Sequence, residues 1–172
     1  MRVTFTRQVG GGSTAEFVRP DGVTVRMRSY DRKHAIPHDL AHLVAERTFR
    51  VQRGVWGSLA AGALFGSVEV VAGRRRHDDR IRSAALLKAN KAEIDIAELL
   101  AYVVQQGVDQ DRPTAARALA AAWGSRRTGP PPWPADVLPR AVDELRALGE
   151  QWARLPVDGT LAVDWPLPAR RR

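Results

Sequence analysis

The chain has 172 residues, of which 44% are hydrophobic and 27% charged, a composition typical of a globular protein with one core. It contains no cysteine, which excludes disulfides, thiolate metal sites and thiol nucleophiles. The formal net charge of +8 favours an acidic partner. Of the 27 basic residues, however, all except Lys33, Lys88 and Lys91 are arginine. A chain rich in arginine and alanine is also expected from GC-rich codons, whatever its function.

The first thirty residues are expected to form three antiparallel strands that share one apolar face. Val3 and Phe5 alternate with threonines, and Val25 and Met27 alternate with polar residues, which is the period of a half-buried strand. The Pro-Asp-Gly sequence at 20–22 predicts a tight turn between the second and third strands, since proline presets φ and glycine accepts positive φ.

Five helices are expected next. A proline or acidic residue at the start of a segment and apolar residues spaced three to four apart indicate them. Their ranges are about 37–50, 55–65, 78–106, 113–124 and 135–155. A strand is expected after the second helix, and another at about 160–165 that returns to the N-terminal strands. Nine apolar positions of these elements are expected in the core: Phe5, Phe17, Val25, Leu40, Leu99, Val103, Leu145, Trp152 and Val163.

The pattern predicts an α+β fold, in which a mainly antiparallel sheet of three N-terminal strands and the C-terminal strand is packed by about five helices on one face. We expect a single domain over residues 1–168 and a basic tail over 169–172. The longest apolar stretch, 55–72, contains several glycines and Glu69, so no membrane span is expected. The N-terminus lacks the apolar region of a secretory signal, and we expect a cytoplasmic protein.

The motif HDLAH, which begins at residue 38, lies in the first expected helix. At about 100° per residue its polar side chains fall on one stripe with Glu46, nearly opposite the apolar residues. Histidines at i and i+4 can converge on one ion. The stripe predicts a site for Zn or another divalent metal, with His38 and His42 as ligands and Glu46 or His34 as a third. A polar helix face in contact with solvent is the alternative.

The spacing of His38 and His42 resembles the His-Glu-x-x-His helix of the zincins over five residues, with Asp39 where that family has its catalytic glutamate. The resemblance implies a hydrolase that uses metal-activated water, with Asp39 as its acid or base, although aspartate is one methylene shorter. A loop or helix must also cover the histidines, because an open helix surface cannot hold a substrate.

Two His-Asp pairs, His38-Asp39 and His77-Asp78, also resemble the dyads of the HD phosphohydrolases, which hold metal ions on an all-helical fold. The strands expected at both ends of this chain argue against that fold. Asp78 is in addition a typical residue for the start of a helix.

Two other classes of function stay open. Binding of nucleic acid or another acidic partner would use two arginine clusters, which are Arg74, Arg75 and Arg76, and Arg170, Arg171 and Arg172. A non-catalytic protein-interaction domain would use the proline-rich stretch 130–134 or the small residues Ser58, Gly62 and Gly66. The oligomeric state also stays open.

Overall fold

The computed structural model of the protein describes residues 1–29, 34–74 and 77–167. Within these ranges one sheet is formed by β1 (Arg2–Arg7), β2 (Ser13–Val18), β3 (Thr24–Ser29), β4 (Val68–Ala72) and β5 (Thr160–Asp164). The helices are α1 (His38–Thr48), α2 (Val55–Ala61), α3 (Asp79–Gly107), α4 (Arg112–Gly124) and α5 (Val137–Ala153), with a short 3-10 turn, η1 (Val9–Gly11), after β1.

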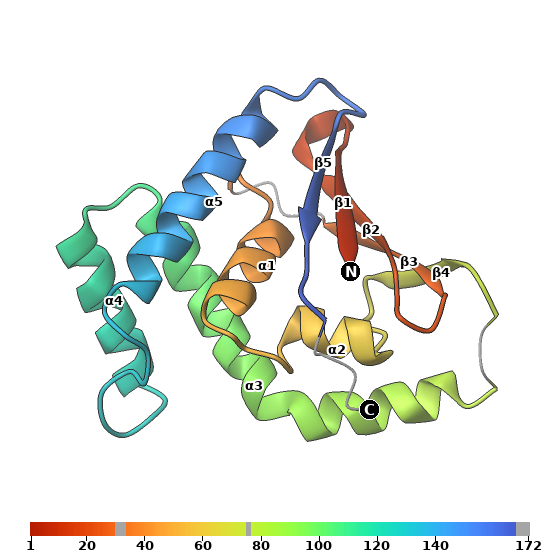
Figure 1. The fold of residues 1–172 in the computed structure, drawn as a ribbon, viewed down its shortest axis with the longest axis horizontal. Coiled ribbons are helices and arrows are strands. Elements are labelled where there is room, and N and C mark those ends of the chain that lie inside the picture. Colours follow the sequence, from red (N-terminus) through yellow and green to blue (C-terminus); the bar gives the residue numbers. More distant parts are fainter. Residues whose placement is uncertain (30–33, 75–76, 168–172) are drawn as a thin grey trace.

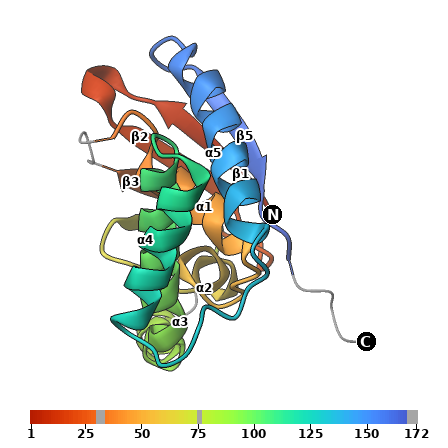
Figure 2. The same cartoon turned by 90° about the vertical axis from the view of Figure 1, so that its left-hand side faces the viewer.

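The strand order is β4-β3-β2-β1-β5, and all neighbouring strands are antiparallel. The helices lie on one face of this sheet and leave the other face open (Figure 1 and Figure 2). The α+β fold expected from the sequence is therefore confirmed, with β4 as a fifth strand. The sequence predicted a strand after the second helix, but not that it would pair with β3.

The C-terminal strand β5 pairs with β1, so the two ends of the chain lie side by side in the sheet (Figure 1). Val3 is opposite Val163 and Phe5 is opposite Leu161, and all four side chains are buried. This pairing follows from the alternation of apolar residues in both segments, because a register shift of one residue would turn them to the open face.

Helix α1 lies between the sheet and the longer helices α3 and α5 (Figure 1), and it is buried on almost every side. Leu40 and Leu43 are fully buried, as the apolar stripe predicts. His42 and Glu46 are also buried, with 3% and 0% of their surface exposed. His42 and Glu46 therefore do not belong to a solvent-exposed helix face, because His42 contacts Glu98 of α3 and Glu46 contacts the start of α2.

Helix α2 is shorter than expected and ends at Ala61 rather than at residue 65. Gly62 ends it in the left-handed conformation, with φ of 112°, which glycine adopts without strain. Ser58 is fully buried and its hydroxyl accepts a hydrogen bond from Asn90, so it packs inside the protein. No helix in the described part of the chain combines the length and apolar character that crossing a bilayer requires.

The proline-rich stretch between α4 and α5 is attached to the core by Trp133. Its indole N–H donates to the carbonyl oxygen of Phe49 at 3.0 Å, and its ring meets those of Phe49 and Trp123 edge to face. Partner binding by this stretch or by the small residues near α2 stays a prediction.

Candidate metal centre

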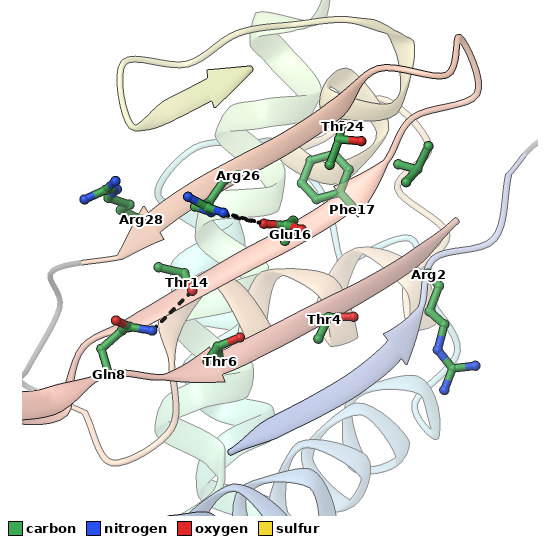
Figure 3. Close-up of a pocket in the computed structure, with 11 residues that line it drawn as sticks. Arg2, Thr4, Thr6, Gln8, Thr14, Glu16, Phe17, Thr24, Arg26 and Arg28 are labelled. Atoms are coloured by element: carbon green, nitrogen blue, oxygen red, sulfur yellow. Dashed lines mark hydrogen bonds and ion pairs between the residues drawn. The ribbon is translucent and has the colours of Figure 1, made fainter. Parts of the chain in front are cut away.

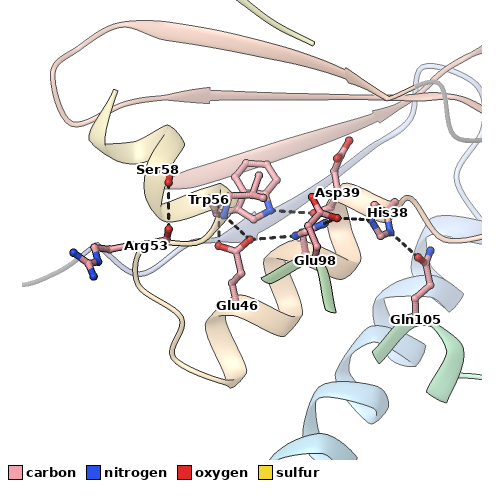
Figure 4. A network of polar contacts seen from close by, with 10 residues as sticks. His38, Asp39, Glu46, Arg53, Trp56, Ser58, Glu98 and Gln105 are labelled. Atoms are coloured by element: carbon pink, nitrogen blue, oxygen red, sulfur yellow. Dashed lines mark hydrogen bonds and ion pairs between the residues drawn. The ribbon is translucent and has the colours of Figure 1, made fainter. Parts of the chain in front are cut away.

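Three side chains that can bind a metal ion meet between α1 and α3. They are His38, His42 and Glu98, whose ligand atoms all lie within 4.8 Å of one another (Figure 4). Oε2 of Glu98 is 3.2 Å from Nε2 of His42 and 3.7 Å from Nε2 of His38. Both imidazoles therefore direct the same ring nitrogen at one carboxylate oxygen.

The helical spacing of the histidines brings their rings together. His38 and His42 are one turn apart on α1, and their ring centroids are 4.7 Å apart with the planes at 87°. Glu98 comes from α3, whose Leu99 and Leu100 are buried in the core. His42 is buried, whereas the side chains of His38 and Glu98 are 31% and 54% exposed, so the cluster is open to solvent on one side.

The other nitrogen of each ring is held by an acceptor. Nδ1 of His38 lies 2.8 Å from the amide oxygen of Gln105, and the Gln105 amide nitrogen donates to the carbonyl of Ile36, which fixes the orientation of the amide. Nδ1 of His42 lies 3.3 Å from Oε1 of Glu46. In each neutral ring Nδ1–H can therefore donate outward and leave the lone pair of Nε2 facing Glu98. Metal-binding histidines in proteins are usually held in this way.

Glu46 has a structural role beside the cluster. Its two carboxylate oxygens accept the backbone N–H groups of Val55 and Trp56 at 3.0 Å each, which are the first N–H groups of α2 (Figure 4). Gly54 permits this approach, because a Cβ at that position would lie 2.5 Å from Oε2 of Glu46. The buried carboxylate thus joins the start of α2 to His42.

The ionisable groups in and beside the cluster shift one another's pKa. Burial opposes a charged His42, but hydrogen bonds to Glu46 and Glu98 outweigh it and raise the pKa of His42 to about 9. Hydrogen bonds from His38 and His42 hold the pKa of Glu98 well below its usual range, and Glu98 in turn raises the pKa of His38. Burial raises the pKa of Glu46 despite its contact with His42. Without metal, a protonated His42 can donate to both carboxylates.

Asp39 follows His38 on α1 but lies outside the cluster, and its carboxyl points away from Glu98 (Figure 4). Burial raises its pKa, while the nearby imidazoles and a hydrogen bond with Ser29 oppose this shift. Its backbone carbonyl accepts the indole N–H of Trp56 at 3.0 Å. Asp39 is half-buried, and a carboxyl with a raised pKa is a suitable proton acceptor.

The structure brings together two of the predicted metal ligands, His38 and His42, and adds Glu98, which the sequence reasoning missed. Glu46 contacts the far side of the His42 ring, and His34 does not belong to the cluster. Glu98 directly precedes a core position of α3, which gives a reason to expect it near the core boundary. No sequence pattern indicated that this part of α3 would pack against α1.

The second His-Asp pair is not part of the centre. His77 and Asp78 are exposed residues before α3, and neither belongs to the His38, His42 and Glu98 cluster. Glu69, on β4, forms ion pairs with Arg26 and Arg28 and is also outside the cluster.

The arginine clusters are only partly described. Arg74 is exposed, whereas Arg75, Arg76 and Arg170 to Arg172, with the predicted tail, lie outside the described residues. Nucleic-acid binding by these clusters stays a prediction.

The open face of the sheet is a separate polar surface. It forms a shallow cavity of about 640 Å³ lined by threonines of β1, β2 and β3 and by three arginines (Figure 3). Arg26 pairs with Glu16 at 2.9 Å and with Glu69 at 3.5 Å, and Arg28 pairs with Glu69 at 3.2 Å. These carboxylates offset much of the positive charge, so this face is not strongly attractive to a polyanion.

Searches against protein-family models, curated proteins and solved structures gave no match to this chain. The cluster of His38, His42 and Glu98 is therefore the feature on which a functional conclusion can rest.

Proposed function

We propose that this protein binds one divalent transition-metal ion through Nε2 of His38, Nε2 of His42 and the carboxylate of Glu98. The observation that carries the proposal is the convergence of both Nε2 atoms on Oε2 of Glu98, at 3.7 and 3.2 Å. In a tetrahedral site with bonds of about 2.1 Å, ligand atoms lie roughly 3.4 Å apart. Small side-chain movements therefore suffice to accommodate the ion.

The donor set favours zinc or a neighbouring transition metal over magnesium or calcium, because two imidazoles and one carboxylate suit the former and all-oxygen sites suit the latter. Three protein ligands leave a coordination position for water, as in catalytic zinc sites. Glu46 and Gln105 then act from outside the site by holding Nδ1 of each histidine. A proton and the metal compete for Nε2 of His42.

Untagged protein is expected to carry about one equivalent of metal after dialysis against zinc, measured by elemental analysis. His38→Ala, His42→Ala and Glu98→Ala each remove one ligand and are expected to weaken zinc binding by at least about 100-fold. His77→Ala is the matched control, since His77 is exposed and outside the cluster. Equal zinc content in wild type and the three ligand variants would contradict the proposal.

The reaction that such a site supports best is hydrolysis by a metal-bound water, whose pKa the ion lowers towards ~7. Asp39 follows His38 on α1, and its raised pKa supports a role as proton acceptor. Its carboxyl points away from Glu98 (Figure 4), so this role requires the side chain to turn towards the bound water. Zinc-loaded wild type is expected to hydrolyse p-nitrophenyl acetate faster than protein treated with a chelator. Asp39→Asn is expected to retain zinc but lose about 100-fold of this rate. An unchanged rate at equal zinc content would remove Asp39 from the reaction.

A further inference from the structure

Tyr102 is an exposed aromatic residue on the part of α3 that contacts the histidines of α1. Two α3 residues contact the His38 ring, since Oε2 of Glu98 lies 3.7 Å from Nε2 and the amide oxygen of Gln105 lies 2.8 Å from Nδ1. Tyr102 lies between them, about one helical turn from each. At about 100° per residue, the three positions fall within roughly 60° around the axis of α3. Tyr102 therefore belongs to the same helix face as the two residues that contact His38.

Tyr102 lies on the solvent side of this helix face. Its neighbour Ala101 is fully buried, whereas 59% of Tyr102 is exposed. Long side chains on a helix lean towards its N-terminal end, so the ring of Tyr102 is expected over the turn that carries Glu98. The side chains of His38 and Glu98 are themselves partly exposed, which leaves the metal cluster open on one side. We therefore expect the ring of Tyr102 to border this opening.

Packing within the protein does not explain the position of Tyr102. It is the one exposed aromatic residue in the part of the chain that the structure describes, because the other described rings are buried or half-buried. Its hydroxyl forms no hydrogen bond with a described residue. Aromatic rings bind one another through offset or edge-to-face contacts. An exposed ring beside an open coordination position can therefore bind a ring of the ligand, and aromatic side chains commonly line ligand sites.

We propose that the metal site takes a substrate with an aromatic or similarly flat ring next to the group that binds the metal, and that Tyr102 stacks on this ring. The inference rests on the proposed function, since the metal must hold the other end of the substrate. Tyr102 acts as a binding residue that selects and orients the substrate, and it takes no part in proton transfer. The ring of the side chain is required for this role, whereas the hydroxyl is not.

The test titrates the zinc-loaded full chain with benzohydroxamate and with acetohydroxamate, followed by isothermal titration calorimetry. Both probes bind zinc through the same two oxygen atoms, which the ion accommodates by becoming five-coordinate. They differ in carrying a phenyl or a methyl group. Tyr102→Ala is expected to weaken the binding of benzohydroxamate by about five- to tenfold, because the stacking contact is lost. The zinc content and the affinity for acetohydroxamate are expected to stay those of wild type.

Tyr102→Phe keeps the ring and is expected to bind both probes like wild type. Ile81→Ala is the matched control, because Ile81 is a large exposed apolar residue near the other end of α3. Unchanged benzohydroxamate affinity in zinc-loaded Tyr102→Ala, or an equal loss in Tyr102→Phe, would overturn this inference and leave the metal site standing. Wild type that holds no zinc would overturn the metal site and this inference together.

Discussion

Glu46→Ala is expected to lower the free energy of unfolding by about 3–5 kcal/mol. The Glu46 side chain is completely buried and accepts hydrogen bonds from the N–H groups of Val55 and Trp56, while facing Nδ1 of His42. Alanine would leave two backbone donors and an imidazole without an acceptor, in a space that the carboxylate had filled. The start of α2 and the position of His42 would both be disturbed.

Urea denaturation of metal-free protein measures this loss. Glu46→Gln keeps one acceptor oxygen and most of the volume, so its stability is expected to lie between those of wild type and the alanine variant. Glu150→Ala is the matched control, because Glu150 is exposed on α5 and its ion pair with Arg154 is 3.8 Å long. Its effect is expected to stay below about 1 kcal/mol. Similar stabilities of Glu46→Ala and Glu150→Ala would contradict the role assigned to Glu46.

The stability of the metal-free protein is expected to fall as the pH rises from about 6.5 to about 9. Hydrogen bonds to Glu46 and Glu98 raise the pKa of His42 to about 9 from its usual 6.5, so in this interval the folded state holds a proton that the unfolded state has released. Stability from this group is complete below pH 6.5 and lost through pH 9, with a loss of up to roughly 3 kcal/mol. The raised pKa of His38 acts in the same direction.

Denaturation at several pH values, with a chelator present, measures this slope. His42→Gln removes the titrating group and is expected to flatten it. Zinc affinity should change in the opposite sense and increase from pH 6 to 8, because the metal needs an unprotonated Nε2. Stability of the metal-free protein that stays constant or increases between pH 6.5 and 9 would exclude the protonated His42 inferred here.

Local sequence patterns predicted much of the fold because each pattern depends on one element alone. All nine apolar residues expected in the core, such as Phe5 on β1 and Leu145 on α5, are buried. The alternation in β5 also predicted its return to the N-terminal strands, and the structure confirms the pairing with β1. The left-handed Gly62, which ends α2 early, was missed because apolar residues continue beyond it.

The sequence predicted two of the three residues of the cluster, because these residues come from two helices far apart in the chain. The spacing of His38 and His42 is a property of α1 alone, so the sequence identified both. Glu98 reaches them only because α3 packs along α1, which no local pattern encodes. The position of Glu46 depends on a different contact, because it shares the stripe of the histidines but accepts the first N–H groups of α2.

We propose that one metal ion is bound by two residues of α1 and one of α3. Anomalous diffraction from a crystal of zinc-loaded protein tests it directly. A single strong peak is expected about 2.0–2.2 Å from Nε2 of His38, Nε2 of His42 and an oxygen of Glu98. A zinc-loaded crystal with no peak at these three atoms, or with its peak on other side chains, would contradict the claim.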